Sequence, residues 1–181
     1  AETIRAIRRH TPSAAVEVLI PDCKGDPDAL QTIFDARPDV LNHNLETVAR
    51  LQRAVRPSAA YARSLSVLAR AKEAGLTTKS GLIVGMGETD DEVLGALADL
   101  RAVGVDIVTI GQYLRPTTHH LPVARWWTPD EFAKLNEQRG AAIRRRDDGI
   151  GALQNHGATR ETSGFTGGGQ PRPCRTQQSR E

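Results

Sequence analysis

Cysteine is scarce in this chain, which has 181 residues and only two cysteines, Cys23 and Cys174. They lie far apart in the sequence and form no CxxC pair, which excludes a disulfide framework and agrees with a reducing compartment. Aromatic residues make up only 4% of the chain. No apolar run reaches the roughly 20 residues of a membrane-spanning helix, and the N-terminus shows no signal-peptide pattern. We therefore expect a cytoplasmic protein with no membrane partner.

Charge of one sign is also lacking, since the net charge at pH 7 is only +2. Up to Gln138 the acidic residues slightly outnumber Lys and Arg, whereas basic residues predominate in 139–181. The sequence pI of 8.8 therefore comes from the C-terminal region. An acidic main part argues against a nucleic-acid-binding domain, although a basic tail could touch RNA.

The composition divides the chain into two regions. Residues 1–138 have the apolar content of one globular domain. Residues 139–181 contain an Arg triplet at 144–146, a Gly triplet at 167–169 and little apolar material. We expect this basic, low-complexity tail to be disordered, or to be read out of frame.

Four strand–helix units follow one another within residues 1–138. Apolar runs predict strands at 16–20, 40–41, 82–84 and 105–110. Helical spacing and capping signals predict helices at 2–10, from Asp26-Pro27 towards Pro38, at 47–55, from Pro57 to Gly75, from Thr89 to Gly104 and from Thr128 onward. This alternation predicts a parallel α/β fold, either a barrel or an open sheet.

Polar residues follow each predicted strand. They are Asp22 and Lys24, then Asn44 and Glu46, then Gly87 and Glu88, and finally Gln112 and Arg115. Right-handed crossovers bring the carboxyl ends of parallel strands to one edge, where α/β proteins bind ligands. A solvated rim would also be polar, but four such strand ends in succession favour a binding site.

The stretch K-S-G-L-I-V-G-M-G-E at 79–88 is the centre of this prediction. Lys79 and Ser80 are expected to precede the strand proper. Gly85 and Gly87 would let the backbone turn sharply and let a ligand approach its N–H groups. The alternative interpretation is an ordinary turn from strand to helix.

Five segments in order and spacing closely resemble lipoyl synthases of the radical S-adenosylmethionine (SAM) superfamily. They are V-E-V-L-I-P-D-C-K-G, D-V-L-N-H-N-L-E-T-V, R-A-K-E-A-G, T-K-S-G-L-I-V-G-M-G-E-T and Q-Y-L-R-P-T-T-H-H-L-P-V. The resemblance covers about residues 1–138. It implies a partial (β/α) barrel of the radical SAM type, represented here by its C-terminal strand–helix units.

The resemblance also implies an activity. Members of this family cleave SAM reductively on a [4Fe-4S] cluster held by a CxxxCxxC loop. They insert two sulfur atoms, supplied by an auxiliary [4Fe-4S] cluster, at C6 and C8 of an octanoyl chain. That chain is attached to a carrier protein, which is a lipoyl domain or the H protein of glycine cleavage.

Carried over to this sequence, the family's SAM contacts fall on six residues: Asn44, Glu46, Gly85, Gly87, Gln112 and Arg115. Asn44 and Glu46 would bind ribose hydroxyls or the ammonium group, pointing the same way from an extended segment. Alternatively, Asn44 or Thr47 caps the next helix. Gly85 and Gly87 would approach the adenine, and Gln112 and Arg115 would complete the pocket, unless Arg115 forms a surface ion pair.

The sequence also departs from the family pattern. It has no CxxxCxxC and no R-S-S-Y near its C-terminus, so the ligands of both clusters are missing and no catalytic residue is assigned. Cys23 is interpreted as a packing residue. We therefore expect a fragment with an exposed strand edge and poor stability in isolation.

Two other classes of function remain open. One is a non-catalytic module that binds adenosine or SAM. The other is a metal-dependent hydrolase that uses His43, His119 and His120, although adjacent histidines point apart in an extended segment and no metal site is expected.

Overall fold

The computed structural model describes residues 1–143 and 155–156, with side chains described up to residue 137. Its centre is a parallel sheet with the strand order β1-β2-β3-β4-β5. The strands are β1 (Glu17–Leu19), β2 (Val40–Asn42), β3 (Thr77–Val84), β4 (Ile107–Gln112) and β5 (Asn155–His156). Each strand lies beside its predecessor in the chain, so the sheet order never reverses. This winding is that of a barrel segment rather than of a doubly wound open sheet.

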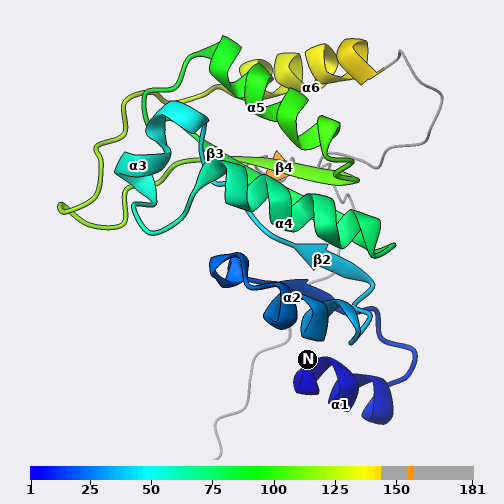
Figure 1. Cartoon of the computed structure of the whole chain (residues 1–181). Helices are drawn as coiled ribbons and strands as arrows, with labels where there is room; N and C mark the ends of the chain where they lie inside the picture. Colours follow the sequence, from blue (N-terminus) through cyan, green and yellow to red (C-terminus); the bar gives the residue numbers. More distant parts are fainter. Residues whose placement is uncertain (144–154, 157–181) are drawn as a thin grey trace, which may run out of the picture.

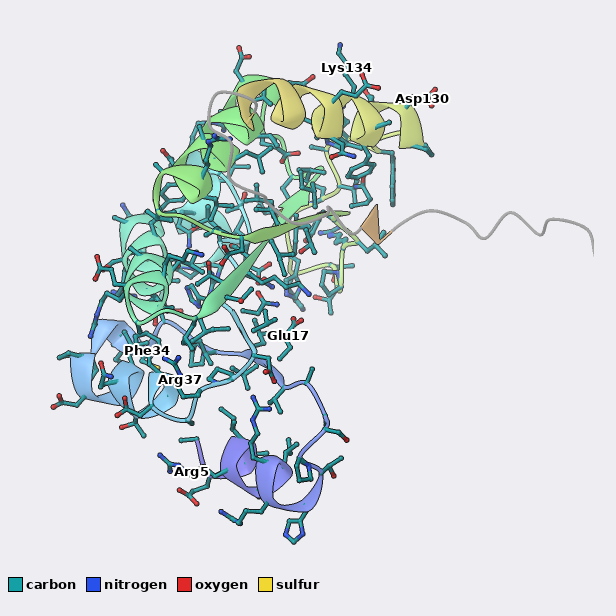
Figure 2. The ribbon with its side chains drawn as sticks, turned by 90° about the vertical axis from the view of Figure 1, so that its right-hand side faces the viewer. Arg5, Glu17, Phe34, Arg37, Asp130 and Lys134 are labelled. Atoms are coloured by element: carbon teal, nitrogen blue, oxygen red, sulfur yellow. The ribbon has the colours of Figure 1, made fainter. Side chains whose placement is uncertain are left out.

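The crossover helices lie on one side of the sheet (Figures 1 and 2). The helices of the chain are α1 (Glu2–His10), α2 (Pro27–Phe34), α3 (Gln52–Val55), α4 (Tyr61–Glu73), α5 (Asp90–Ala102) and α6 (Pro129–Ile143), with 3₁₀ turns η1 (Cys23–Gly25) and η2 (Ala49–Leu51). Right-handed crossovers that always step in the same direction place α2, α4 and α5 on the same face. The structure thus confirms the predicted parallel α/β fold of barrel type.

The local sequence explains where the helices begin. The Asp26 side chain accepts hydrogen bonds from the backbone N–H groups of Asp28 (2.9 Å) and Ala29 (3.2 Å), with proline at the next position. Thr89 and Glu92 form the predicted capping box at the start of α5. These caps satisfy N–H groups that the first helical turn leaves without partners.

The core lies between the sheet and the helices. Alternate residues of β3, from Thr78 to Val84, are buried against α4 and α5, whereas Lys79, Gly81 and Ile83 belong to the opposite face. Leu45, Leu68 and Leu100 are central to the larger apolar cluster. A second cluster around Leu30, Phe34 and Leu41 fixes α2 on β1 and β2.

Several predicted boundaries were wrong. β3 begins at Thr77, so Lys79 and Ser80 lie within the strand. The helix predicted at 47–55 is reduced to η2 and α3, and the helix predicted from Pro57 begins at Tyr61. The domain boundary predicted at Gln138 stays a prediction; α6 ends at Ile143, and β5 pairs with β4. The predicted disorder of the rest of 139–181 lies outside the described residues.

Core packing gives the first testable prediction. The Leu68 side chain is completely buried, whereas Leu19, on the face opposite the helices, is 66% exposed. Leu68→Ala should lower the free energy of unfolding by about 2–5 kcal/mol, because it removes buried apolar contacts and leaves a cavity. Leu19→Ala is the matched control and should change it by less than about 0.5 kcal/mol. Urea unfolding followed by circular dichroism measures both, and equal losses would contradict this core assignment.

Candidate functional site at the carboxyl ends of the strands

The segment after β2 continues its pairing with β3. The backbone N–H of His43 donates to the carbonyl of Lys79 (3.0 Å), and that of Glu46 donates to the carbonyl of Gly81 (2.9 Å). The N–H of Ile83 in turn donates to the Glu46 carbonyl (2.7 Å). These bonds place Asn44 and Glu46 against the C-terminal half of β3.

Glu46 has an unusual backbone conformation for a residue with a side chain. Its φ is +71°, in the left-handed region, so the expectation that Asn44 and Glu46 point the same way from a regular extended segment was wrong in its premise, because the segment is not regularly extended. Such strain costs about 1–3 kcal/mol and persists where surrounding bonds hold it, often at binding sites. Within the described part of the chain, the half-buried Glu46 carboxylate accepts no hydrogen bond.

Asn44 lies over a glycine of β3. A Cβ atom on Gly81 would be 2.8 Å from Asn44 Oδ1 and 3.1 Å from Thr109 Oγ1, so the absent side chain makes room for the amide. The alternative that Asn44 or Thr47 caps the next helix was wrong, because the N-cap of η2 is Val48, without a side-chain cap bond. The Thr47 hydroxyl is instead buried without a described partner.

Arg56 completes this group and was missed from the sequence. Its Nη1 donates to the backbone carbonyl of Asn44 (2.9 Å), which places a cation beside the two candidate ligand-binding side chains. No local sequence pattern predicts this contact, because Arg56 lies beyond η2 and α3, and an arginine before a proline is typical of an exposed surface position.

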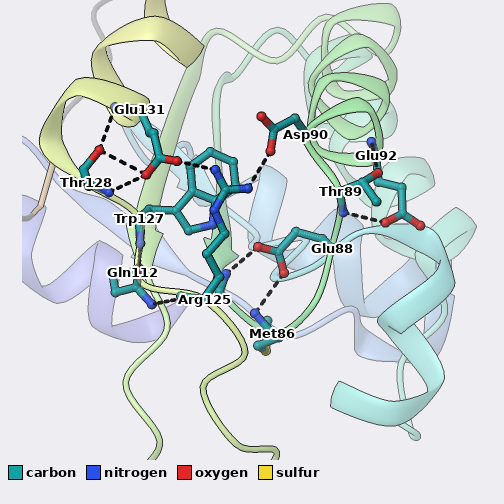
Figure 3. A network of polar contacts seen from close by, with 11 residues as sticks. Met86, Glu88, Thr89, Asp90, Glu92, Gln112, Arg125, Trp127, Thr128 and Glu131 are labelled. Atoms are coloured by element: carbon teal, nitrogen blue, oxygen red, sulfur yellow. Dashed lines mark hydrogen bonds and ion pairs between the residues drawn. The ribbon is translucent and has the colours of Figure 1, made fainter.

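The turn after β3 is closed by its own glutamate. The Glu88 carboxylate is almost fully buried and accepts the N–H groups of Gly85 and Met86, the latter at 2.9 Å (Figure 3). Gly85 and Gly87 have φ values of +110° and +104°, which favour glycine. The N–H groups of Gly85 and Met86, which were predicted to be open to a ligand, therefore bind within the chain.

Residues 124–127 cross directly over Gly85. A Cβ on Gly85 would lie 2.6 Å from the Arg125 carbonyl, and Ala124 N–H donates to the Gly85 carbonyl (2.8 Å). Gln112 fixes the crossing: its Nε2 donates to the carbonyls of Tyr113 (3.0 Å) and Arg125 (3.1 Å), and its Oε1 accepts Trp127 N–H (2.9 Å). We call residues 124–127 the crossing segment.

Ion pairs anchor the crossing segment and the turn (Figure 3). Arg125 pairs with Asp90 of α5 (2.8 Å) and with Glu131 of α6, and its guanidinium lies 4.0 Å from the centre of the Trp127 ring. The Thr128 N–H and Arg125 lower the pKa of Glu131 to about 2. Arg50 similarly pairs with Glu92 (2.6 Å) and donates to the Gly87 carbonyl (2.8 Å).

Arg115 lies apart from this assembly. Its Nε donates to the His120 carbonyl (2.9 Å) within its own exposed loop. Of the six predicted site residues, the structure therefore brings Asn44, Glu46, Gly85, Gly87 and Gln112 to the C-terminal end of β3 and its neighbours, and leaves Arg115 in the loop that follows β4. Asp22 is also engaged elsewhere, in an ion pair with Arg63 (2.6 Å).

The histidines do not converge. Both ring nitrogens of the buried His43 are bonded, Nδ1 with the Ile20 carbonyl (2.9 Å) and Nε2 with Ser64 Oγ (3.0 Å). His119 and His120 are exposed. Among residues 1–137, no three His, Cys, Asp or Glu side chains gather as a metal ion would require, which removes the support for a metal-dependent hydrolase.

Comparisons with known proteins agree with this fold. The family model described as the Radical SAM superfamily matches residues 1–111. The chain therefore belongs to the radical SAM superfamily.

Within that superfamily, the chain is 62% identical over 139 residues to a lipoyl synthase from Rubrobacter xylanophilus, covering 76% of this chain and 43% of that protein. A lipoyl synthase from Kineococcus radiotolerans is 54% identical over 138 residues, covering 76% of this chain and 41% of that protein. The chain thus spans less than half the length of these curated relatives.

The fold comparison gives a more distant neighbour. Streptococcus suis SuiB, also solved bound to S-adenosylmethionine, matches with a TM-score of 0.68 and 10% identity, over 86% of this chain and 35% of SuiB. At that identity the match supports the shared fold alone. Among the described helices, none is long and apolar enough to cross a membrane.

The turn at Gly85 gives the second prediction. Gly85→Ala should lower the free energy of unfolding by roughly 2 kcal/mol or more, because the new methyl group would collide with the crossing segment and the residue would retain a positive φ. Gly95→Ala, in the exposed interior of α5 with no atom within 4 Å of the new Cβ, should instead stabilise by about 0.5–1 kcal/mol. Urea unfolding curves compare the two, and a neutral Gly85→Ala would refute the close crossing.

His43 gives a prediction for pH dependence. Burial lowers its pKa below the ordinary value of 6.5, so the folded chain holds His43 neutral. Below pH 6.5 the unfolded chain binds a proton that the folded chain does not, so this group reduces stability as pH falls, by up to about 1.4 kcal/mol per unit, until the folded pKa is reached.

The His43→Gln variant should be less stable at pH 7 and should show a shallower decline below pH 6.5. His119→Gln, which changes an exposed histidine, is the control and should keep the wild-type slope. Free energies of unfolding between pH 5 and 8 provide the measurement. Parallel curves for wild type and His43→Gln would contradict the lowered pKa of the buried His43.

Proposed function

We propose that this chain is the C-terminal part of the catalytic barrel of a lipoyl synthase, which inserts two sulfur atoms at C6 and C8 of a protein-bound octanoyl chain. The single observation that carries the proposal is the 62% identity over 139 residues to the R. xylanophilus lipoyl synthase.

The residues at these strand ends fit SAM. Asn44 and Glu46 present an amide and a carboxylate without hydrogen-bonding partners among residues 1–137, suited to ribose hydroxyls and an ammonium group. Arg56 adds a cation suited to the carboxylate of the same molecule. Gly85, Gly87 and Gln112 would form the wall near the adenine, with Arg115 at its outer end. SAM would supply the radical chemistry, and these residues would bind and orient it.

The family's [4Fe-4S] clusters do not fit the residues described. An iron–sulfur cluster needs several thiolates in one place, and Cys23 is the one cysteine in the described residues. Burial and the carboxylates of Asp22 and Asp26 raise the pKa of the Cys23 thiol, which disfavours the thiolate that iron binds. We assign no step of the reaction to a cluster held by this part of the chain.

Two further elements belong to the same proposal. The partner is an octanoylated carrier protein, either a lipoyl domain or the H protein of glycine cleavage, and the location is the cytoplasm. The second candidate function is a non-catalytic module that binds SAM or adenosine. Two observations together favour it: the polar residues at the strand ends are present, and the chain lacks the cluster cysteines.

Binding of S-adenosylhomocysteine, which needs no cluster, tests the adenosyl site. Isothermal titration calorimetry should detect binding to the chain, and Glu46→Gln and Asn44→Ala should each weaken it at least about tenfold by removing a charged or polar contact. His119→Gln should leave the affinity unchanged. An absence of binding, or equal affinity for all four proteins, would overturn the assignment.

A second measurement separates the two candidate functions. The chain is combined with the cysteine-bearing N-terminal part of the R. xylanophilus enzyme and supplied with SAM, reductant and an octanoylated H protein. Lipoyl formation that is detected by mass spectrometry and lost with Glu46→Gln would support the proposal that the chain is part of a lipoyl synthase. Binding of S-adenosylhomocysteine without lipoyl formation favours the non-catalytic module.

A further inference from the structure

A polar cluster on the face of the sheet opposite the helices plays no part in the site above. It consists of Glu17 on β1, Asn42 on β2 and Lys79 on β3, and we call it the inner-face cluster. Lys79 Nζ contacts Glu17 Oε1 (3.0 Å) and Oε2 (3.1 Å), and Asn42 Nδ2 donates to Glu17 Oε1 (3.2 Å). Figure 2 shows Glu17 on the side of the strands away from α2 and α4.

The burial within this cluster is uneven. The Lys79 side chain is only 14% exposed, whereas that of Glu17 is 43% exposed. Lysine is rarely buried, and a cross-strand ion pair with so exposed a carboxylate adds little stability. Asn42 Oδ1 is buried with no described hydrogen-bond donor, an arrangement that costs about 1–3 kcal/mol. A ligand that uses these atoms would offset the cost.

The free hydrogen-bonding positions of the cluster indicate which chemical group a ligand would need. The Lys79 ammonium has three donors, of which Glu17 occupies two, so one remains for a carbonyl oxygen. Asn42 Oδ1 needs an N–H donor. Asn42 and Lys79 are register partners on adjacent strands, so the donor and the acceptor stand side by side. A secondary amide carries both complementary groups.

Apolar residues flank this pair in the same row of the sheet. Register pairs Leu19 with Asn42 on one side and Lys79 with Ile107 on the other. Leu19 is exposed, whereas the space over Gly81, two residues beyond Lys79 on the same face, is taken by the Asn44 side chain. The row thus combines one amide-binding position with an apolar surface on either side.

We propose that the inner-face cluster binds the amide of an acyl-lysine, whose carbonyl oxygen accepts from Lys79 Nζ and whose N–H donates to Asn42 Oδ1. The inference rests on the proposed function, whose substrate is an octanoyl chain joined to a lysine by such an amide. The flexible four-carbon stem of Lys79 provides the movement that gives the amide access to Asn42.

The test uses Nα-acetyl-Nε-octanoyl-lysine as the probe for the complete 181-residue chain, with the oxygen ester of equal length and free octanoate as comparison ligands. Titration followed by ¹⁵N NMR should show binding of the amide at least fivefold tighter than that of the ester, which lacks the N–H. Lys79→Met, which keeps the stem length, should weaken amide binding about tenfold. Lys134→Met, on the exposed side of α6, is the matched control and should bind like wild type.

Asn42→Leu is a second variant that separates loss of binding from loss of folding. It removes the buried unpaired oxygen, so the free energy of unfolding should stay equal or rise while amide binding falls about tenfold and the preference over the ester disappears. If amide and ester bind equally well to the wild-type chain, or if Lys79→Met and Asn42→Leu bind the amide as wild type does, the proposal is overturned.

S-adenosylhomocysteine binding, measured on the same proteins, distinguishes the two proposals. Both Lys79→Met and Asn42→Leu should retain it. Binding of S-adenosylhomocysteine without amide selectivity would refute the inner-face cluster alone. A third outcome is that the wild-type chain prefers the amide, both variants lose this preference, and no protein binds S-adenosylhomocysteine. That outcome would support the inner-face cluster and refute the adenosyl site.

Discussion

The order of the parallel strands is the constraint on which the rest of the structure depends. Because every right-handed crossover steps to the next strand in the same direction, the helices accumulate on one face and the strand ends on one edge. The apolar side of the sheet is therefore used for the core. The opposite side is left to polar residues such as Lys79 and Asn42, and the strand ends are left to Asn44, Glu46 and Gln112.

A second constraint acts at the end of β3. The chain returns after β4 and passes over Gly85 at a distance that no side chain tolerates, and Gln112 binds the Arg125 carbonyl and the Trp127 N–H of the crossing segment. Arg125 then joins α5 to α6 through Asp90 and Glu131. The glycines in the strand-exit motif thus allow the chain to pack on itself, and the predicted ligand-binding residues Asn44 and Glu46 come from the segment that follows β2.

Local signals predicted most of the fold. Capping boxes at Thr89 and Thr128, the proline after Asp26 and the apolar run at 82–84 all depend on neighbours in the sequence, and the corresponding elements formed. The candidate site was predictable only in part, because its geometry depends on contacts between distant residues. Neither the positive φ of Glu46 nor the bond from Arg56 to Asn44 has a local signature. β3 was predicted too short because its polar residues Thr78 and Ser80 are buried under the helices.

The crossing over Gly85 also bears on how the chain can vary. Residues 113–123 form a loop whose two ends are joined at its base by Gln112 and by the bond between Ala124 and Gly85. Lengthening a loop that is already closed adds little entropic cost, because closure entropy grows only with the logarithm of loop length. Insertions into this loop should therefore cost little stability, because the bonds at its base keep the strand ends in their arrangement.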